Sequence, residues 1–262
     1  MTHILVDDIE MYYETPHGFL DGREEVLTLL IHGAGGSSQH WQPLLPYLID
    51  KMCPILIDIP GHGRSEGIVP NSIDDAALLL DHFLTRLDVE QPVYCVGHSL
   101  GGIIAQRFAM LFPERVARLA LITTSARIQI HIDFLEAALT GRWNLDAFRL
   151  CFSPDIPKEV QDLVLNEYTK MRLASDSAAF MNLENVDLRG KVSTLTVPTL
   201  IITGDDDVII SPRHSRFLHK EIPYSTLMVV PHGGHYVHVE QPERVAEALN
   251  RFSNVSEFDP FS

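Results

Sequence analysis

The chain has 262 residues, of which 45% are hydrophobic, and carries a formal net charge of −15 at pH 7. This length suits one large α/β domain, or a domain with an insertion, and no apolar run approaches the roughly 20 residues that a membrane-spanning helix needs. The strong acidity argues against duplex nucleic acid or an anionic membrane surface as a partner.

The first residues, MTHILVDDIEMYYE, are acidic and lack the basic start and apolar centre of a signal peptide. We therefore expect a cytoplasmic protein. The cysteines Cys53, Cys95 and Cys151 are odd in number and show no C-x-x-C spacing. This pattern disfavours a disulfide framework or a zinc knuckle, and Cys53 and Cys95, in apolar runs, are expected in the core.

Short apolar runs typical of buried strands alternate with segments of helical periodicity. The predicted strands cover residues 26–32, 54–59, 92–96, 116–123, 196–203 and 225–230, and the predicted helices cover 38–50, 72–87, 99–112 and 242–252. Ser72 and Asp75 resemble a capping box. The alternation predicts a mostly parallel sheet with helices on both faces. It breaks at about residues 126–190, where helical patterns predict an insertion near the carboxyl ends of the strands, the edge at which such sheets bind ligands.

Two segments match the pattern G-x-S-x-G, GRSEG at 63–67 and GHSLG at 97–101. The pattern marks a nucleophilic serine only where a strand, a sharp turn and a helix follow one another directly. Ser99 meets this condition, because a strand precedes it and a helix follows at once. Ser65 does not, because a loop precedes it and Pro70 and Asn71 prevent an immediate helix. We therefore interpret Ser99 as the nucleophile and Ser65 as a loop residue.

A serine nucleophile needs a base and an acid that orients the base. Three aspartates, Asp205, Asp206 and Asp207, follow the predicted strand at 196–203. Three histidines, His232, His235 and His238, follow the strand at 225–230. The H-x-x-H-x-x-H spacing could suggest a metal site, but these histidines lie in a loop that enters a helix, without a cysteine or carboxylate cluster of metal type, so we expect no metal.

These motifs resemble the α/β-hydrolase family. Its G-x-x-D pattern is matched by Gly204–Asp207, its G-H-x-x-x-x-E-x-P pattern by Gly234–Pro242, and its D-x-x-G-x-G-x-S loop by DIPGHGRS at 58–65. The resemblance implies an α/β-hydrolase fold with Asp207 as the acid and His235 as the base. It also explains GRSEG as the end of the DIPGHGRS loop.

The oxyanion of the tetrahedral intermediate needs two N–H donors. One is the amide of Leu100, directly after the nucleophile. HGAGGSS at 32–38 resembles the H-G-x turn of the family, which implies the Ala34 amide as the second donor. His32 is expected to tie this turn together through hydrogen bonds.

The resemblance implies a hydrolase core formed by residues 1–125 and 191–262 and a helical cap formed by residues 126–190. The cap is expected to set substrate choice, although most of its apolar side chains could simply pack it onto the core. The candidate pocket residues are His98, Phe134, Leu135, Leu139, Trp143, Phe148 and Phe152.

These residues predict a serine hydrolase that cleaves a carboxylic ester of a small or medium acyl group, with a small-molecule substrate and no cofactor. The same triad could act on a thioester, a lactone, an acyl-carrier methyl ester or a C–C bond, and a non-enzymatic receptor could retain it. Haloalkane dehalogenases and epoxide hydrolases are disfavoured, because they need an aspartate where this chain has Ser99.

Overall fold

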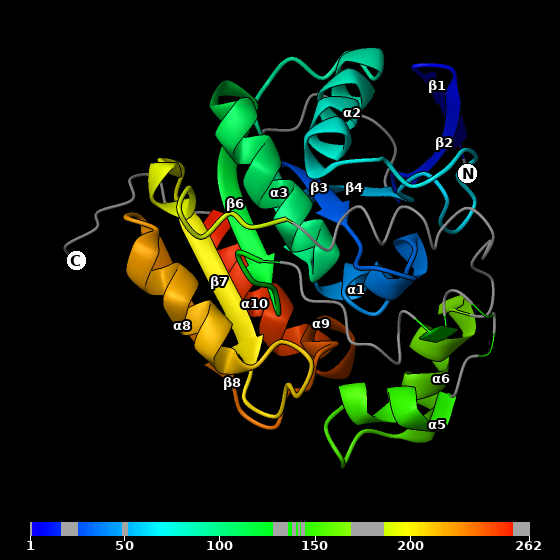
Figure 1. The fold of residues 1–262 in the computed structure, drawn as a ribbon, viewed down its shortest axis with the longest axis vertical. Coiled ribbons are helices and arrows are strands. Elements are labelled where there is room, and N and C mark those ends of the chain that lie inside the picture. Colours follow the sequence, from blue (N-terminus) through cyan, green and yellow to red (C-terminus); the bar gives the residue numbers. More distant parts are fainter. Residues whose placement is uncertain are drawn as a thin grey trace.

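The computed structural model of the protein describes residues 2–16, 26–48, 52–127, 136–137, 140, 142, 145–168 and 186–253. Within these residues eight strands form one sheet in the order β1-β2-β4-β3-β5-β6-β7-β8 (Figure 1). They are β1 (Thr2–Val6), β2 (Ile9–Glu14), β3 (Val26–Ile31), β4 (Met52–Ile57), β5 (Val93–His98), β6 (Val116–Ile122), β7 (Thr199–Gly204) and β8 (Ser225–Val230). β2 pairs antiparallel with β1 and β4, and every other described pair is parallel. The predicted fold class is confirmed.

Helices cover both faces of this sheet (Figure 1). α2 (Ile73–Arg86), α3 (Leu100–Leu111) and α8 (Pro212–Glu221) pack on one face, and α1 (Leu45–Leu48) and α10 (Pro242–Ser253) pack on the other. Successive side chains of a strand point to opposite faces. Leu29 and Ile31 of β3 therefore join the core under α2 and α3, whereas Leu30 joins the core under α1 and α10.

The single helix predicted over residues 38–50 is wrong. The chain instead forms the 3-10 helix η1 (Ser38–Trp41), a turn, and the four-residue helix α1. Pro43 and Pro46 explain the break, since proline lacks an N–H group and its ring collides with the preceding helical turn.

The hairpin β1–β2 and the helix α8 were not predicted. Asp7 and Asp8 join the two strands of the hairpin with φ angles of 47° and 65°. Positive φ at both central residues is the backbone of the two-residue turns that suit the twist of paired strands. The adjacent residues Asp7 and Asp8 therefore indicate a tight turn between two paired strands. α8 begins directly after Ser211 with a proline at its first position, which is a usual helix start.

Residues 126–190, between β6 and β7, are called here the β6–β7 insertion, and the helices α5 (Leu145–Phe148) and α6 (Lys158–Tyr168) within it lie beyond the carboxyl ends of the parallel strands (Figure 1). The 3-10 helix η3 (Arg149–Cys151) lies between these two helices, and η4 (Val192–Thr194) follows the insertion just before β7. An isolated antiparallel bridge pairs Arg127 with Asp187, and the Leu188 N–H donates to Ala126 O over 2.7 Å. The two ends of the insertion therefore leave and rejoin the core side by side.

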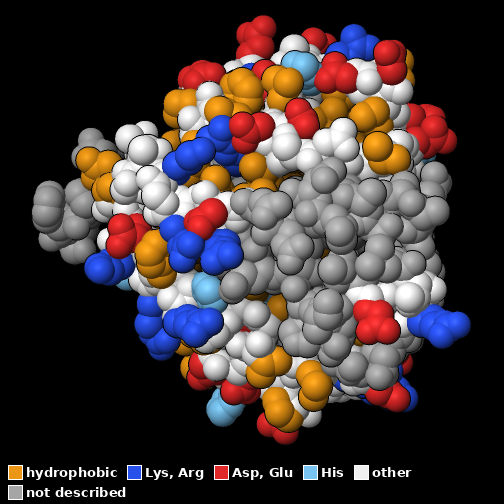
Figure 2. Space-filling view, in the orientation of Figure 1, with side chains coloured by type: hydrophobic (Ala, Val, Ile, Leu, Met, Phe, Trp, Pro, Cys, Tyr) orange, Lys and Arg blue, Asp and Glu red, His pale blue; other side chains and the backbone are white. Residues whose placement is uncertain are grey.

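The short elements η2 (Pro113–Arg115) and α9 (Val237–Glu240) complete the described structure. None of its helices combines the length and the apolar character needed to cross a lipid bilayer. On the face drawn in Figure 2, the described apolar side chains are interspersed with charged ones. The large apolar side chains are instead concentrated in the two cores beside the sheet.

Candidate active site

Ser99 stands at a sharp turn between β5 and α3, as the sequence predicted. Its backbone has φ 51° and ψ −116°, a conformation that side-chain-bearing residues rarely adopt. The turn also requires very close packing, because a Cβ atom on Gly101 would lie 2.2 Å from Ile31 O. Glycine at this position lets α3 begin directly against the end of β3. The Ser99 side chain is thereby held at the carboxyl edge of the sheet.

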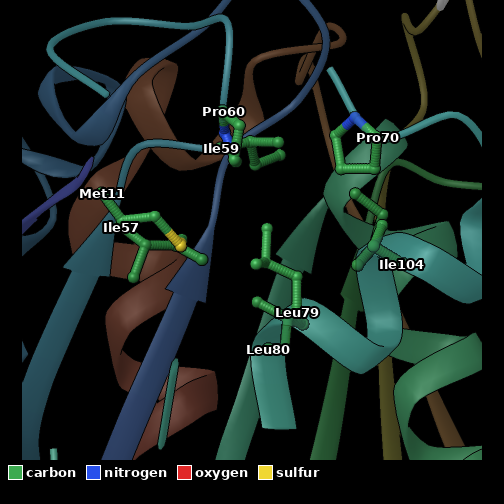
Figure 3. A pocket seen from close by; sticks show the side chains of 9 residues that line it. Met11, Ile57, Ile59, Pro60, Pro70, Leu79, Leu80 and Ile104 are labelled. Carbon is green, nitrogen blue, oxygen red and sulfur yellow. The ribbon is translucent and has the colours of Figure 1, made fainter. Parts of the chain in front are cut away.

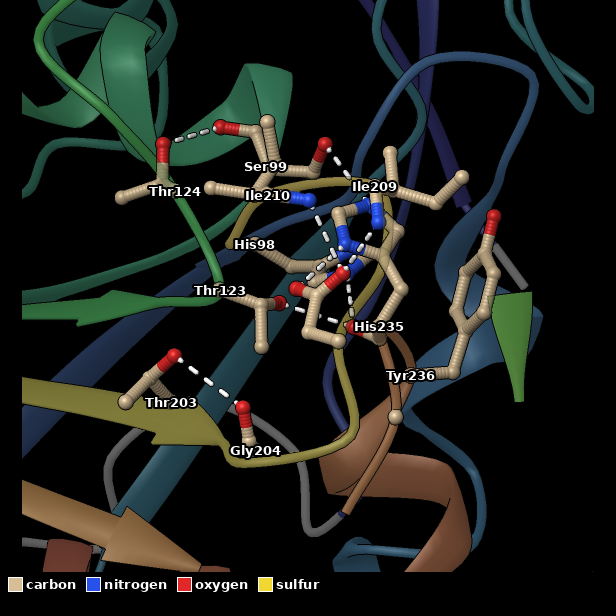
Figure 4. Close-up of polar contacts among 12 residues, drawn as sticks. His98, Ser99, Thr123, Thr124, Thr203, Gly204, Ile209, Ile210, His235 and Tyr236 are labelled. Carbon is tan, nitrogen blue, oxygen red and sulfur yellow. Dashed lines mark hydrogen bonds and ion pairs between the residues drawn. The ribbon is translucent and has the colours of Figure 1, made fainter. Parts of the chain in front are cut away.

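His235 connects Ser99 to Asp207, and Figure 4 shows its ring beside the Ser99 side chain. His235 Nε2 lies 3.1 Å from Ser99 Oγ, and His235 Nδ1 lies 3.0 Å from Asp207 Oδ2. A carboxylate only accepts, so Nδ1 carries the proton and Nε2 is free to accept from the serine hydroxyl. The side chains of His235 and Asp207 are 6% and 0% exposed, which shields their interaction from water.

The loop after β7 fixes the Asp207 carboxylate. Asp207 Oδ1 accepts hydrogen bonds of 2.8 Å from the amides of Ile209 and Ile210, and this leaves Oδ2 for His235. The neighbouring aspartates face other groups. Asp205 Oδ1 accepts from the His232 amide over 2.6 Å, and Asp206 Oδ2 accepts from Ser153 Oγ over 3.0 Å. Of the three, Asp207 is the one whose carboxylate lies within hydrogen-bonding distance of the His235 ring.

The turn at residues 32–38 packs directly against the nucleophile. A Cβ atom on Gly33 would lie 3.1 Å from Ser99 Cβ, so the Ala34 amide follows at the edge of the site. Leu100 is the first residue of α3, where helix amides have no partner within the helix. His32 ties the turn as predicted, with Nδ1 donating to Gly33 O over 2.7 Å and Nε2 accepting from the Ile59 amide over 2.9 Å. The oxyanion role of the Ala34 and Leu100 amides stays a prediction.

Ser65, the other serine in a G-x-S-x-G pattern, is buried away from His235. Its hydroxyl donates to Asp58 O over 2.6 Å and accepts from the Tyr12 amide over 2.8 Å. The Asp58 carboxylate in turn accepts from the amides of Ser38 and Arg64 over 2.6 and 2.8 Å. Burial raises the pKa of Asp58, and these hydrogen bonds oppose that effect. These hydrogen bonds connect the DIPGHGRS loop to β2 and to the turn at residues 32–38.

Several of the predicted pocket residues, Phe134, Leu135, Leu139 and Trp143, lie outside the described residues. Phe148 is half-buried, with its ring 5.4 Å from that of Tyr168, and Phe152 stacks on Tyr236 with ring centres 5.2 Å apart. His98 is buried behind His235, and its Nε2 lies 3.0 Å from His235 O. The pocket-lining role of Phe148 and His98 stays a prediction.

A small cavity of about 10 Å³ lies elsewhere, between α2, α3 and the start of the DIPGHGRS loop (Figure 3). Its lining is apolar and consists of Met11, Ile57, Ile59, Pro60, Pro70, Ala76, Leu79, Leu80 and Ile104. This volume is at the limit for one water molecule, which would also need polar partners. The cavity is therefore a packing gap and too small for an ester substrate.

The three histidines after β8 do not point toward a common site. His232 is exposed, His235 contacts Ser99, and His238 is buried with its ring 4.4 Å from that of His98. Burial lowers the pKa of both His98 and His238. Among the residues that the structure describes, no group of three His, Cys, Asp or Glu side chains is arranged to hold a metal ion.

Comparisons with known proteins agree with this architecture. The family model described as "Alpha/beta hydrolase family" matches residues 28–248. The chain is 31% identical to 3-oxoadipate enol-lactonase 2 of Acinetobacter baylyi over 232 residues, which covers 82% of this chain and 84% of that protein. It is 28% identical to the pimeloyl-[acyl-carrier protein] methyl ester esterase of Photobacterium profundum over 252 residues, covering 86% and 93% of the two chains.

Among solved structures, the enol-lactonase from Burkholderia xenovorans superposes with a TM-score of 0.84 at 21% identity, covering 96% of this chain and 99% of that one. At 21% sequence identity, this superposition shows a shared fold and nothing about activity. The family model, by contrast, spans both the strand–turn–helix around Ser99 and the loops that carry Asp207 and His235. The chain belongs to the α/β-hydrolase family.

Proposed function

We propose that this protein is a serine hydrolase that cleaves a carboxylic ester of a small or medium acyl group through an acyl-serine intermediate. One observation carries the proposal, the hydrogen-bonded chain from Ser99 through His235 to Asp207, with distances of 3.1 and 3.0 Å, at a strained turn between a strand and a helix. In this arrangement a base and an acid activate an otherwise weak serine nucleophile.

In the first half-reaction, Ser99 Oγ attacks the ester carbonyl carbon while His235 Nε2 takes the serine proton. Asp207 stabilises the imidazolium that forms, and the amides of Leu100 and Ala34 donate to the oxyanion. The intermediate collapses, and His235 returns the proton to the departing alcohol. In the second half-reaction water attacks the acyl-serine with His235 as base, which releases the carboxylic acid and restores Ser99.

The β6–β7 insertion supports a choice of substrate by size. Its position beyond the carboxyl ends of the strands suits a cap of residues 126–190 over the site, in which its apolar side chains contact the acyl group and exclude water. The named activities of the two relatives, an enol-lactonase and a methyl ester esterase, both concern ester bonds. A lactone or an acyl-carrier methyl ester is therefore the second candidate substrate class for the same residues.

The test compares wild type, Ser99→Ala and Ser65→Ala in the hydrolysis of p-nitrophenyl acetate and butyrate. We expect Ser99→Ala to lower kcat by about 10⁴-fold or more, since the nucleophile is lost. Ser65→Ala removes two buried hydrogen bonds. It should lower the free energy of unfolding by about 1–3 kcal/mol and leave turnover of the folded protein within a few-fold.

Full activity in Ser99→Ala would contradict the proposal. No turnover by wild type, together with a rise in Tm on adding a small ligand, would favour a receptor instead. A series of p-nitrophenyl esters tests the size of the acyl group. If kcat/KM were highest for chains of sixteen carbons or more, the small or medium acyl assignment would be wrong.

A further inference from the structure

The main chain of His235 is held from two directions. On one side, its N–H donates to Cys151 O of the β6–β7 insertion over 2.7 Å. On the other, its carbonyl oxygen accepts from Thr123 Oγ1 over 2.8 Å and lies 3.0 Å from His98 Nε2 (Figure 4). A carbonyl only accepts, so His98 Nε2 carries the proton of that hydrogen bond. Residues at the ends of β5 and β6 and Cys151 of the insertion therefore all contact the backbone of His235.

Glu240 accepts hydrogen bonds from the amides of both residues that flank His235. Its Oε2 accepts from the Gly234 amide over 2.8 Å, and its Oε1 accepts from the Tyr236 amide over 3.0 Å. Oε2 also accepts from the Ser153 amide over 3.1 Å. One carboxylate therefore joins the loop of the base to the insertion.

The segment Cys151–Ser153 of the insertion makes further contacts around the same loop. Ser153 Oγ donates to Asp206, the neighbour of Asp207, over 3.0 Å. Phe152 stacks on Tyr236, and the hydroxyls of Tyr168 on α6 and Tyr236 are hydrogen-bonded to each other. These contacts place the insertion and the base in one connected network.

Thr123 is the strained member of this network. It follows β6 with φ 42°, a value that is a clear outlier for a β-branched residue. Such strain persists where the surroundings fix the conformation, and it concentrates at functional sites. Here the conformation directs the Thr123 hydroxyl at His235 O, and the next residue, Thr124, donates to Ser99 O over 2.6 Å.

We infer that Glu240 and Thr123 are positioning residues for His235, and that the segment Cys151–Ser153 completes the same support. The inference rests on the proposed function, because it assigns His235 as the base. Alignment matters because a misplacement of about 1 Å in a catalytic group can cost about 100-fold in rate.

The first test is Glu240→Gln, with Glu243→Gln as the matched control, because Glu243 is exposed three residues later on α10. The NH₂ group of glutamine, which replaces one carboxylate oxygen, cannot accept from a backbone N–H, so at least one of the three contacts to the carboxylate is lost. We expect kcat to fall by about 10- to 100-fold with KM within about 3-fold, and labelling of Ser99 by a fluorophosphonate to slow equally. Glu243→Gln should match wild type.

The second test separates the Thr123 hydroxyl from the strained backbone and stays informative if Glu240→Gln does not fold. Thr123→Val keeps the branched shape and loses the hydroxyl, whereas Thr123→Ser keeps the hydroxyl. We expect Thr123→Val to lower kcat by about 10-fold or more and Thr123→Ser to stay near wild type, at matched far-UV circular dichroism.

Two results would overturn the inference: wild-type kcat in folded Glu240→Gln and Thr123→Val, or equal losses in Thr123→Val and Thr123→Ser. These results differ from a failure of the proposed function. If the proposed function were wrong, Ser99→Ala itself would keep wild-type turnover. If only the positioning inference were wrong, turnover would depend on Ser99 but not on Glu240 or Thr123.

Discussion

At the scale of single residues, the three aspartates after β7 show how contacts assign roles to identical side chains. Asp207→Asn keeps the shape of the side chain but can present an NH₂ group to His235, which disturbs the tautomer that accepts from Ser99. Neutralising the acid of such a triad costs about 10⁴-fold in kcat. We expect a loss of that order in p-nitrophenyl butyrate hydrolysis.

Asp205→Asn is the matched control, because Asp205 contacts the His232 amide and not the His235 ring. It should leave kcat within a few-fold of wild type. Equal losses in the two variants would show that the choice of Asp207 is wrong.

The sequence allowed this prediction at Ser99, Asp207 and His235, because each lies in a short motif that comes soon after a strand. The support around them could not be predicted in the same way. Thr123 and Cys151 reach His235 over separations of 112 and 84 residues, and nothing in the local sequence indicates that a backbone carbonyl will face a particular amide. For Glu240 a signal did exist, since the G-H-x-x-x-x-E-x-P pattern includes it.

At the scale of elements, the start of α3 depends on how closely it approaches β3. A Cβ atom on Gly101 would lie 2.2 Å from Ile31 O and 2.5 Å from His32 O, and backbone atoms cannot move aside without shifting the strand. We expect Gly101→Ala to lower the free energy of unfolding by about 3 kcal/mol or more and to reduce turnover, because overpacking strains the nucleophile turn. Urea unfolding and the ester assay measure both effects.

Gly190→Ala is the control for this substitution, because a Cβ atom there would meet nothing within 4 Å. It should leave stability unchanged or raise it by up to about 1 kcal/mol through the unfolded chain. A tolerated Gly101→Ala would contradict the close approach of α3 to β3.

Elements were predictable where periodicity and context agreed. α2 and α10 have clear apolar stripes and follow their predictions within a few residues. The segment 38–50 carries helical periodicity as well, but its two prolines override that pattern. β1 and β2 were not predicted because neither forms the continuous buried apolar run that is typical of the inner strands.

At the scale of the whole molecule, the fold buries several histidines in their neutral form. Burial lowers the pKa of His40 and His62 to about 4, from 6.5 in an unfolded chain. It also lowers the pKa of His32, His98 and His238. A lowered pKa in the folded state means that the unfolded chain binds more protons below about pH 6.5. Falling pH therefore favours unfolding through each of these groups.

The carboxyl groups of Asp58 and Glu240 have the opposite effect on how the free energy of unfolding changes with pH. Burial raises the pKa of both carboxyl groups, so the folded state takes up their protons more readily than the unfolded chain as the pH falls. The histidines whose pKa is lowered by burial outnumber these two carboxyl groups. The histidines should dominate between pH 6.5 and 4.

We expect the free energy of unfolding, measured by urea titration at several pH values, to fall steeply as the pH is lowered from 6.5 to 4. Each fully neutral buried histidine contributes a slope of about 1.4 kcal/mol per pH unit in this window. His40→Gln removes one such group, so its slope should be smaller than that of wild type by about that amount, whatever its stability at pH 7.5. Parallel curves for the two proteins would show that His40 is protonated as readily in the folded state as in the unfolded chain, and that the acid sensitivity of the fold has another origin.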